Sequence, residues 1–364
     1  MMGRGELTDL TSCRALFALW VFAYHVNLQV EYAHWLGPFA PVVEHGYLGV
    51  DGFFILSGLI LTRVDADTPF TVRGALRFWG KRLARIYPVH FAVIALLGGL
   101  FLAGIAAGIP PREPARFAGF ALLCHLALVQ GWGTLDHWAW NYPSWSISSE
   151  WAGYLLFPLL IACYRVFYKG ALAISLPLCF SILATVADIH GGLNLTFGSS
   201  LLRFFPEFIA GMATTAFIPF IADEAPNRII ALAGAALAVA FAATGHDAMT
   251  VLGLWLMLYG LAMQGDAERP ASIGAIRPLR AMGVISYAFY MSFAPAELLT
   301  TQFFRHLGFA RAAAPLAVAF MLAALTLGLA VLLHVLIEKP ARIALNRRFD
   351  PSRAAALAAG SVAL

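Results

Sequence analysis

Arg14 and His25 stand at the two ends of an otherwise apolar stretch, RALFALWVFAYH. In a helix, eleven residues make about three turns plus roughly 20°, so both side chains lie on one face, about 16 Å apart along the axis. Histidine changes its charge near neutral pH and suits a general base, and arginine suits an anion binder. An ionisable residue inside a membrane span marks a functional site by default. A structural interpretation also fits, with Arg14 extending to the membrane surface and His25 hydrogen-bonded in the core.

Two carboxylates occur where apolar residues are expected. Asp51 lies in GVDGFFILSG, residues 49–58, and Glu150 lies in PSWSISSEWAGYLLFP, residues 143–158. A carboxylate in a span requires a cationic or hydrogen-bonding partner. Either one can therefore orient the imidazole of His25. Asp51 can equally form a purely structural pair, and Glu150 can lie at the membrane interface without a catalytic role.

A run of cations, RFWGKRLARIYP, directly precedes an apolar segment. A planar guanidinium matches the oxygens of a phosphate, so the cluster can hold a phosphorylated ligand. Positive charge at the inner face of a membrane is also an ordinary anchor, and for any single cation that interpretation fits as well. The cations stand at helical spacing, at Arg77, Lys81, Arg82 and Arg85.

The chain that positions these groups has the composition of a membrane protein. Of its 364 residues, 60% are hydrophobic and 12% charged, and the mean hydropathy is +0.77, whereas soluble chains are about 25% charged. Apolar runs long enough to cross a bilayer as helices recur from end to end. We predict an all-α polytopic membrane helical bundle of about ten transmembrane helices, at 10–30, 46–63, 89–108, 151–168, 171–187, 204–220, 229–243, 250–264, 282–303 and 315–337.

The distribution of positive charge predicts the orientation of this bundle. With both termini cytoplasmic, 18 of the 24 Lys and Arg residues lie inside and 5 outside, with Arg14 inside the first span, as the positive-inside rule requires. Counting the short apolar run 118–132 as a span would scatter this bias, so we predict that it does not span. The first span is expected to be retained rather than cleaved as a signal.

One integral-membrane domain, residues 1–349, accounts for all the predicted spans, and the Ala-rich residues 350–364 are expected to be a poorly ordered tail. The last span is expected to stop at IEKPAR, residues 337–342. The net charge of +4 forms no polybasic tract, so no nucleic-acid partner is indicated. The cysteines lack metal-ligand or disulfide spacing, so we expect buried small side chains and no metal site, at Cys13, Cys124, Cys163 and Cys179.

Taken in order, the motifs resemble acyltransferase family 3, a family of membrane O-acyltransferases of bacteria. The set runs from about residue 7 to residue 342. It comprises the Arg14–His25 pair, GVDGFFILSG, KRLARIYP, PSWSISSEWAGYLLFP, FFPEFIAG, SYAFYMSF and IEKPAR. The resemblance implies a cytoplasmic acyl-coenzyme A donor, acetyl-coenzyme A by default, and a place in the bacterial cytoplasmic (inner) membrane. It also implies that the first-span Arg and His and the arginines of the first inner loop are required for activity.

The family's roles carry over to matching positions. Many relatives have a histidine where this chain has Phe293, so no catalytic role is placed there. Tyr287 is assigned to the substrate, although tyrosines in spans most often pack or anchor. The predicted catalytic residues are His25, Arg14, Glu150 and Asp51, the coenzyme A-binding residues are Arg82, Arg85 and Arg14, and the substrate-binding residues are Trp145, Ser146 and Tyr287.

These residues predict an enzyme in which His25 removes the proton of an acceptor hydroxyl as it attacks the thioester carbonyl. An acyl-histidine intermediate is a less favoured version. The sequence leaves four acceptors open: an O-antigen, an exopolysaccharide, a lipid-linked sugar and a small natural product such as a macrolide. Membrane lipids are expected to surround the chain. Its oligomeric state stays open. A proton-coupled transporter also uses buried ionisable residues, but the chain lacks the paired interrupted spans of an inverted repeat.

Overall fold

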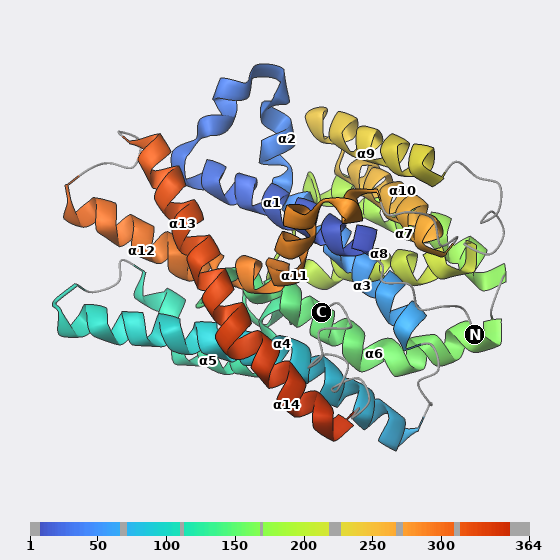
Figure 1. Ribbon diagram of the computed structural model, residues 1–364, viewed down its shortest axis with the longest axis horizontal. Helices are drawn as coiled ribbons and strands as arrows, with labels where there is room; N and C mark the ends of the chain where they lie inside the picture. The colour runs from blue at the N-terminus through green and yellow to red at the C-terminus, as the bar shows by residue number, and fades with distance from the viewer. Residues whose placement is uncertain are drawn as a thin grey trace.

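The structure is a computed structural model in which every described segment is helical or irregular and none is a β-strand. In Figure 1, α13 crosses the other long helices diagonally. The predicted tail, residues 350–364, lies outside the described residues. The structure describes residues 8–65, 71–109, 113–167, 170–217, 227–266, 272–308 and 314–349.

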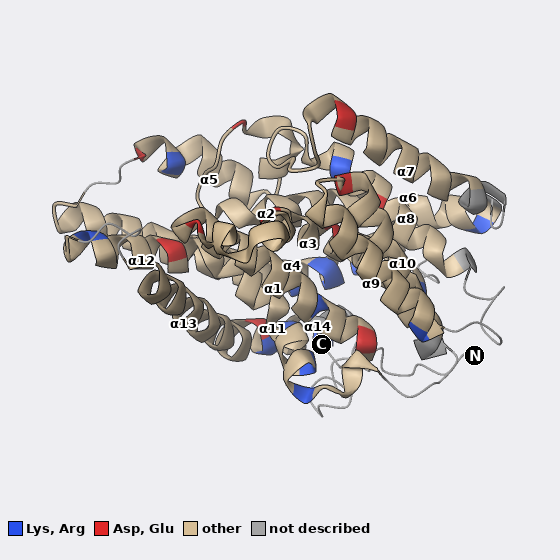
Figure 2. Cartoon of the chain, turned by 90° about the horizontal axis from the view of Figure 1, so that it is seen from above, with Lys and Arg blue, Asp and Glu red and all other residues tan. Residues whose placement is uncertain are grey.

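Several helices are long and apolar enough to cross a membrane, which makes the chain an integral membrane protein of the all-α class. Charged residues are sparse along the ribbon in Figure 2. The count of about ten spans and the cytoplasmic termini stay predictions. Four segments meet the length and hydropathy expected of a span, Tyr32–Val64, Val72–Ala106, Tyr142–Val166 and Pro315–Leu345, and three shorter apolar helices lie at Ile174–His190, Asn227–Ala243 and Asp247–Met263.

Most expected spans coincide with a helix to within a few residues. Glycine in GVDGFFILSG permits close helix packing, because a Cβ on Gly58 would lie 2.0 Å from the carbonyl oxygen of Phe208. The matching helices are α1 Thr8–Val30, α3 Gly49–Val64, α6 Trp145–Phe167, α7 Gly170–His190, α8 Ser200–Phe217, α9 Asn227–Ala243 and α10 Asp247–Asp266.

Two helices, one that begins with the cation run and one within the apolar run 118–132, differ widely in length. The cation run is the beginning of a single helix of 35 residues, α4 (Val72–Ala106), whose N-cap Thr71 accepts a hydrogen bond from the Gly74 amide. The apolar run 118–132 holds only the eight-residue α5 (Gly119–Leu126), about 12 Å long and too short to span a bilayer. This length agrees with the prediction that the run does not span.

The span expected at 282–303 is broken in the middle. It forms α11 (Arg277–Met291) and α12 (Phe293–His306), with Ser292 between them. Pro295 has no N–H, so the carbonyl of Met291 loses its usual helical partner. Such a break at membrane depth is tolerated where it lines a cavity or is buried in protein.

The stop expected at IEKPAR is absent. After α13 (Pro315–Leu333), the chain passes through a π-helical turn, His334–Glu338, directly into α14 (Lys339–Phe349). The short segments that join the long helices are η1 Tyr32–Phe39, α2 Ala40–Glu44, η2 Gly46–Leu48, η3 Pro114–Phe117, the irregular turn Gln130–Thr134, η5 Tyr142–Ser144 and η7 Ile273–Ala275.

The cysteines are buried as expected, with one exception. Cys13, Cys124 and Cys179 lie in the interior, but Cys163 is exposed on α6. The apolar surroundings of Cys163 in the sequence misled the prediction, because in a membrane bundle apolar residues also cover the outer surface of the helices.

Candidate active site

His25 lies in a compact hydrogen-bonded group with one tyrosine and one carboxylate, which we call the histidine site: His25, Tyr142 and Glu297. Nδ1 of His25 lies 2.9 Å from the hydroxyl oxygen of Tyr142 and 3.2 Å from Oε1 of Glu297. The Tyr142 hydroxyl also donates to Oε2 of Glu297, at 2.7 Å. The three residues come from α1, η5 and α12, so the fold assembles the site from distant parts of the chain.

This geometry determines which nitrogen of His25 can act as a base. The Tyr142 hydroxyl uses its hydrogen to donate a hydrogen bond to Glu297. The Tyr142 oxygen is therefore an acceptor toward His25. Nδ1 therefore carries the proton of the neutral imidazole and faces two acceptors. Nε2 keeps the free lone pair, and Glu297 can stabilise the imidazolium that forms when Nε2 takes up a proton, as in a hydrolase triad.

His25 faces a cleft of about 440 Å³, counting the part that is open to the outside. Aromatic side chains form most of its walls, and a few polar groups converge on it, which is the usual make-up of a ligand site. The lining residues are Val21, Tyr24, His25, Leu28, Tyr47, Val50, Trp138, Tyr142, Pro143, Trp145, Asn194, Thr196 and Tyr290.

Glu297 reaches His25 from α12, just past the break in the span. Nδ2 of Asn141 lies 3.5 Å from the carbonyl oxygen of Met291, the carbonyl that Pro295 leaves without its helical donor. Past the break, the ring of Phe293 lies 5.1 Å from the imidazole of His25, and Glu297 follows one turn later. The start of α12 therefore supplies both an apolar and an acidic neighbour of the histidine.

A second ionisable group lies at the other end of α1. The charges that act on half-buried Arg14 are those of Arg85, Glu338 and Glu150, and the same two carboxylates act on Arg85. We call these four residues the arginine site. Within the described residues, no carboxylate oxygen lies within 4 Å of either guanidinium. Two guanidiniums that act on one another electrostatically and form no ion pair can hold an anion such as phosphate.

The carboxylates of the arginine site are held by uncharged or histidine partners. Oε1 of Glu150 accepts from Ser57 at 2.8 Å and from Tyr154 at 2.5 Å. Oε2 of Glu338 lies 2.8 Å from Nδ1 of His334, inside the π-helical turn. Such turns frequently occur at functional positions in helices.

Arg82 is not part of the arginine site. Its side chain is buried, forms an ion pair with Asp65 and lies over the rings of Phe78 and Tyr154, at 5.3 and 5.9 Å. Its guanidinium is therefore committed to the interior, whereas Arg85, three residues later on the same helix, is not.

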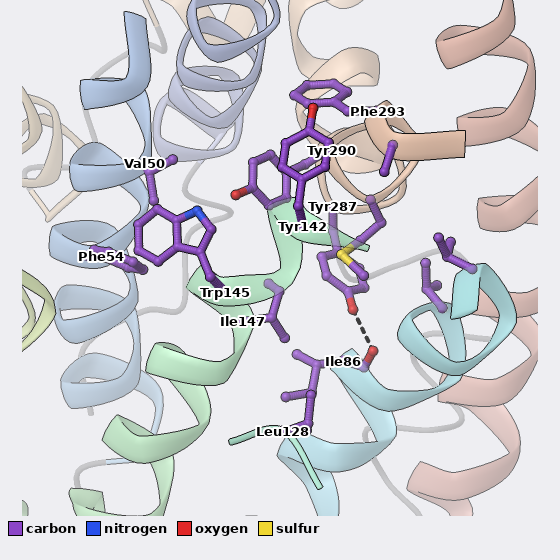
Figure 3. Close-up of a cluster of buried hydrophobic side chains, with 14 of the residues drawn as sticks. Val50, Phe54, Ile86, Leu128, Tyr142, Trp145, Ile147, Tyr287, Tyr290 and Phe293 are labelled. Carbon is purple, nitrogen blue, oxygen red and sulfur yellow. Dashed lines mark hydrogen bonds between the residues drawn. The ribbon is translucent and has the colours of Figure 1, made fainter. Parts of the chain in front are cut away.

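Buried apolar side chains lie between the two sites, and we call Phe54, Trp145, Ile147 and Tyr287 the apolar layer. Figure 3 shows Trp145 at the top of α6 beside Phe54 of α3, and Tyr287 donating to the carbonyl of Ile86, a bond of 2.5 Å. Two helices carry the chain from the cleft to the arginine site, from His25 to Arg14 on α1 and from Trp145 to Glu150 on α6.

Comparison with known proteins assigns the fold to a family. The model of a family described as an acyltransferase domain matches residues 7–335. The chain belongs to this acyltransferase family. The resemblance read from the motifs is thus confirmed over nearly the whole chain.

Three relatives show the breadth of the family. A peptidoglycan O-acetyltransferase of Listeria monocytogenes is 23% identical over 335 residues, 82% of this chain and 50% of the relative. An acyltransferase of Streptomyces mycarofaciens is 36% identical over 161 residues, 42% of this chain and 39% of the relative. An O-acetyltransferase of Staphylococcus aureus is 29% identical over 160 residues, 43% of this chain and 24% of the relative. The chain thus spans half or less of the length of these relatives, and no solved structure matches it.

The acyltransferase fold separates the residues predicted to be catalytic. Neither Glu150 nor Asp51 orients His25, because Glu297 is the carboxylate within 4 Å of the imidazole among the described residues. Glu150 lies instead in the arginine site. Asp51 is fully buried in an ion pair with Arg203, whose guanidinium also lies 5.3 Å from the ring centre of Trp145. The structural pairing considered for Asp51 is therefore formed.

The predicted substrate residues also separate. Trp145 lines the cleft. Ser146 lies behind the cleft wall and donates to the Tyr290 hydroxyl at 3.1 Å, and Tyr287 is buried in the apolar layer. Tyr290 lines the cleft in place of Tyr287. Their roles in binding stay predictions.

Glu297 and Tyr142 are the residues that sequence reasoning missed. One signal for Glu297 was available, since it is the only charged residue in the span expected at 282–303, and a lone carboxylate in a span is a functional hypothesis. Tyr142 directly precedes the quoted PSWSISSEW motif but carries no signal of its own. Among the described residues, no three His, Cys, Asp or Glu side chains gather as a metal site would require.

Proposed function

We propose that the chain is an integral-membrane O-acyltransferase that moves an acyl group, acetyl by default, from cytoplasmic acyl-coenzyme A to a hydroxyl of a carbohydrate acceptor. The acceptor is an O-antigen, an exopolysaccharide, a peptidoglycan or a lipid-linked sugar, and the membrane is the bacterial cytoplasmic membrane. The observation that carries the proposal is the histidine site, in which Nδ1 of His25 lies 3.2 Å from Glu297 and His25 lines an aromatic cleft. Peptidoglycan O-acetylation by a relative that covers most of this chain supports the acceptor class.

In this proposal the histidine site carries the proton transfer. The acceptor hydroxyl oxygen forms a bond to the thioester carbonyl carbon as Nε2 of His25 removes its proton. The carbon–sulfur bond then breaks, and the thiolate of coenzyme A takes up the proton from the His25 imidazolium, so ester and thiol are the products and His25 is neutral again. Glu297 stabilises the transient imidazolium, and Tyr142 fixes the position of both partners.

The arginine site holds the donor in this proposal. Arg14 lies about 16 Å from His25 along α1, on the side where the positive-inside rule places the cytoplasm, and Arg85 of α4 acts on Arg14 there. They contact the phosphates of coenzyme A, while its long pantetheine arm extends toward His25. Since the apolar layer occupies the space between the sites, its side chains must move aside for the arm to pass. When the site is filled, the same apolar surroundings exclude water that would hydrolyse the thioester.

The test is release of coenzyme A from acetyl-coenzyme A by purified protein with native cell-envelope extract. Wild type is compared with His25→Gln and with His246→Gln, a surface control outside the cleft. We expect His25→Gln to lose roughly 10²- to 10⁴-fold in rate, with unchanged yield and melting temperature, and His246→Gln to match wild type. Equal rates for wild type and His25→Gln would move the base elsewhere. No release by wild type with any donor and extract would favour the transporter.

A further inference from the structure

Trp138 is a large aromatic side chain that borders the cleft without being buried. It is 52% exposed, lies among the residues that line the cleft, and stacks on the ring of Tyr142 with 4.9 Å between ring centres and 12° between planes. Packing on Tyr142 fixes the orientation of the indole while leaving half of its surface accessible. Exposed, oriented aromatic rings at a cleft favour a flat apolar ligand face.

The loop that carries Trp138 holds a strained residue. Trp140 has φ +41°, in the left-handed region that bulky side chains rarely adopt, so its backbone is strained. Its backbone amide donates to the Arg116 carbonyl at 2.9 Å, and its indole donates to the Ala118 carbonyl at 3.2 Å. The strained residue stands between Trp138 and Tyr142, so the surrounding structure fixes the positions of both.

Polar groups line the same cleft from a different loop. Asn194 and Thr196 lie between α7 and α8 and both line the cleft. Asn194 is exposed, and its amide donates to the Tyr24 hydroxyl at 3.2 Å, which leaves its carbonyl oxygen and a second N–H for a ligand. The walls of the cleft therefore offer both an apolar platform and hydrogen-bonding groups.

We propose that Trp138 is the platform on which a pyranose ring of the acceptor stacks, with hydroxyls of the sugar bound by Asn194 and Thr196. This inference rests on the proposed function and names the part of the acceptor that the cleft takes. A pyranose ring has a face of C–H groups that packs on an aromatic ring and a rim of hydroxyls that require partners. A purely apolar acceptor matches the platform but leaves the amide and hydroxyl without partners.

The experiment measures transfer of labelled acetyl from acetyl-coenzyme A to a panel of soluble neutral oligosaccharides that includes an N-acetylglucosamine trimer. The variants are Trp138→Ala, Trp138→Phe and the control Trp35→Ala, which removes an equally exposed tryptophan outside the cleft lining. We expect Trp138→Ala to raise the KM for the saccharide about tenfold, with kcat within threefold and the KM for acetyl-coenzyme A unchanged. Trp138→Phe keeps a stacking ring and should stay within about threefold of wild type.

Three outcomes would overturn the platform. The first is an unchanged KM for the saccharide in Trp138→Ala. The second is a loss in Trp138→Ala that is confined to kcat, which would make Trp138 a support for Tyr142 rather than a binding surface. The third is an equal rise in the saccharide KM in Trp35→Ala. Saturation-transfer NMR of the same trimer with wild type and Trp138→Ala reads binding without turnover. Binding lost in Trp138→Ala supports the platform even if no acetyl is transferred, and absent binding to wild type overturns it. Absence of coenzyme A release with every acceptor would instead overturn the proposed function.

Discussion

The histidine site and the arginine site are built on opposite ends of one helix and satisfy their polar groups in opposite ways. In the histidine site, the polar groups on Tyr142 and on Nδ1 of His25 are paired with one another or with Glu297. In the arginine site, two guanidiniums and two carboxylates act on one another at longer range, without an ion pair within 4 Å between them. The first arrangement fixes one nitrogen for proton transfer. The second leaves cations available for an anion from outside the chain.

This difference predicts that the two sites govern different kinetic constants. Interactions formed only in the transition state lower kcat when removed, whereas interactions that hold the donor before reaction raise its KM. Damage to the histidine site should therefore reduce kcat, and damage to the arginine site should change the KM for acetyl-coenzyme A. The predictions that follow test this division, from the largest effect to the smallest.

Glu297→Gln should produce the largest effect after loss of His25 itself. The amide keeps the size of the side chain but cannot stabilise the imidazolium, so we expect kcat to fall roughly 10²-fold with little change in the KM for acetyl-coenzyme A. Initial rates at saturating donor measure it. Glu150→Gln is the matched control, because the sequence left Glu150, like Asp51, open as the partner of His25. A larger kcat loss in Glu150→Gln than in Glu297→Gln would contradict the assignment.

Arg85→Ala should raise the KM for acetyl-coenzyme A about tenfold and leave kcat within about threefold, since a charge-assisted hydrogen bond to phosphate is lost. Titration of coenzyme A itself by calorimetry should show the same weakening. Arg277→Ala removes an exposed cation at the start of α11 and should bind like wild type.

Arg82→Ala provides the contrast within the same motif. It breaks the buried ion pair with Asp65, so we expect a lower melting temperature rather than a specific loss of donor affinity. A selective tenfold loss of coenzyme A affinity in Arg82→Ala, with stability unchanged, would show that the cation run binds as a unit.

The sequence allowed the relative placement of Arg14 and His25 to be predicted, but not the residues that contact them. Helical periodicity alone places Arg14 and His25 on one face and about 16 Å apart, because that relation depends only on the geometry of one helix. The carboxylate that meets His25 depends on tertiary contacts across 272 residues, from position 25 to position 297. The break at Ser292, followed by Pro295, divides that span into two helices, and the sequence pattern alone did not locate it.

Sequence alone also does not show which of Arg82 and Arg85 is paired, because that again depends on tertiary contacts. Three residues along a helix correspond to about 300°, so the two guanidiniums leave α4 about 60° apart. Which of them meets Asp65 depends on how α4 is rotated against α3 and α6, and a composition of four cations contains no information on that rotation. The close approach at Gly58 was predictable because a small residue in an apolar helix has few other uses.

Tyr142→Phe should weaken the histidine site without abolishing it. The phenyl ring still packs against Trp138, and Oε1 of Glu297 remains 3.2 Å from Nδ1 of His25. Loss of one hydrogen bond predicts a fall in kcat of about three- to tenfold, measured in the same saturating assay. A loss as large as that of Glu297→Gln would show that the hydroxyl contributes as much to the action of His25 as the carboxylate does.

Glu338→Gln should have the smallest effect, and its sign is opposite to that of Arg85→Ala. The Glu338 carboxylate acts on both Arg14 and Arg85, so its negative charge opposes the binding of phosphate at the same place. Removing that charge should lower the KM for acetyl-coenzyme A about two- to threefold, and the gain should shrink as salt is added. Glu31→Gln, at an exposed position beyond the far end of α1, should change nothing. A rise in KM for Glu338→Gln at unchanged melting temperature would mean that Glu338 positions the arginines, and that the two sites differ less than their contacts suggest.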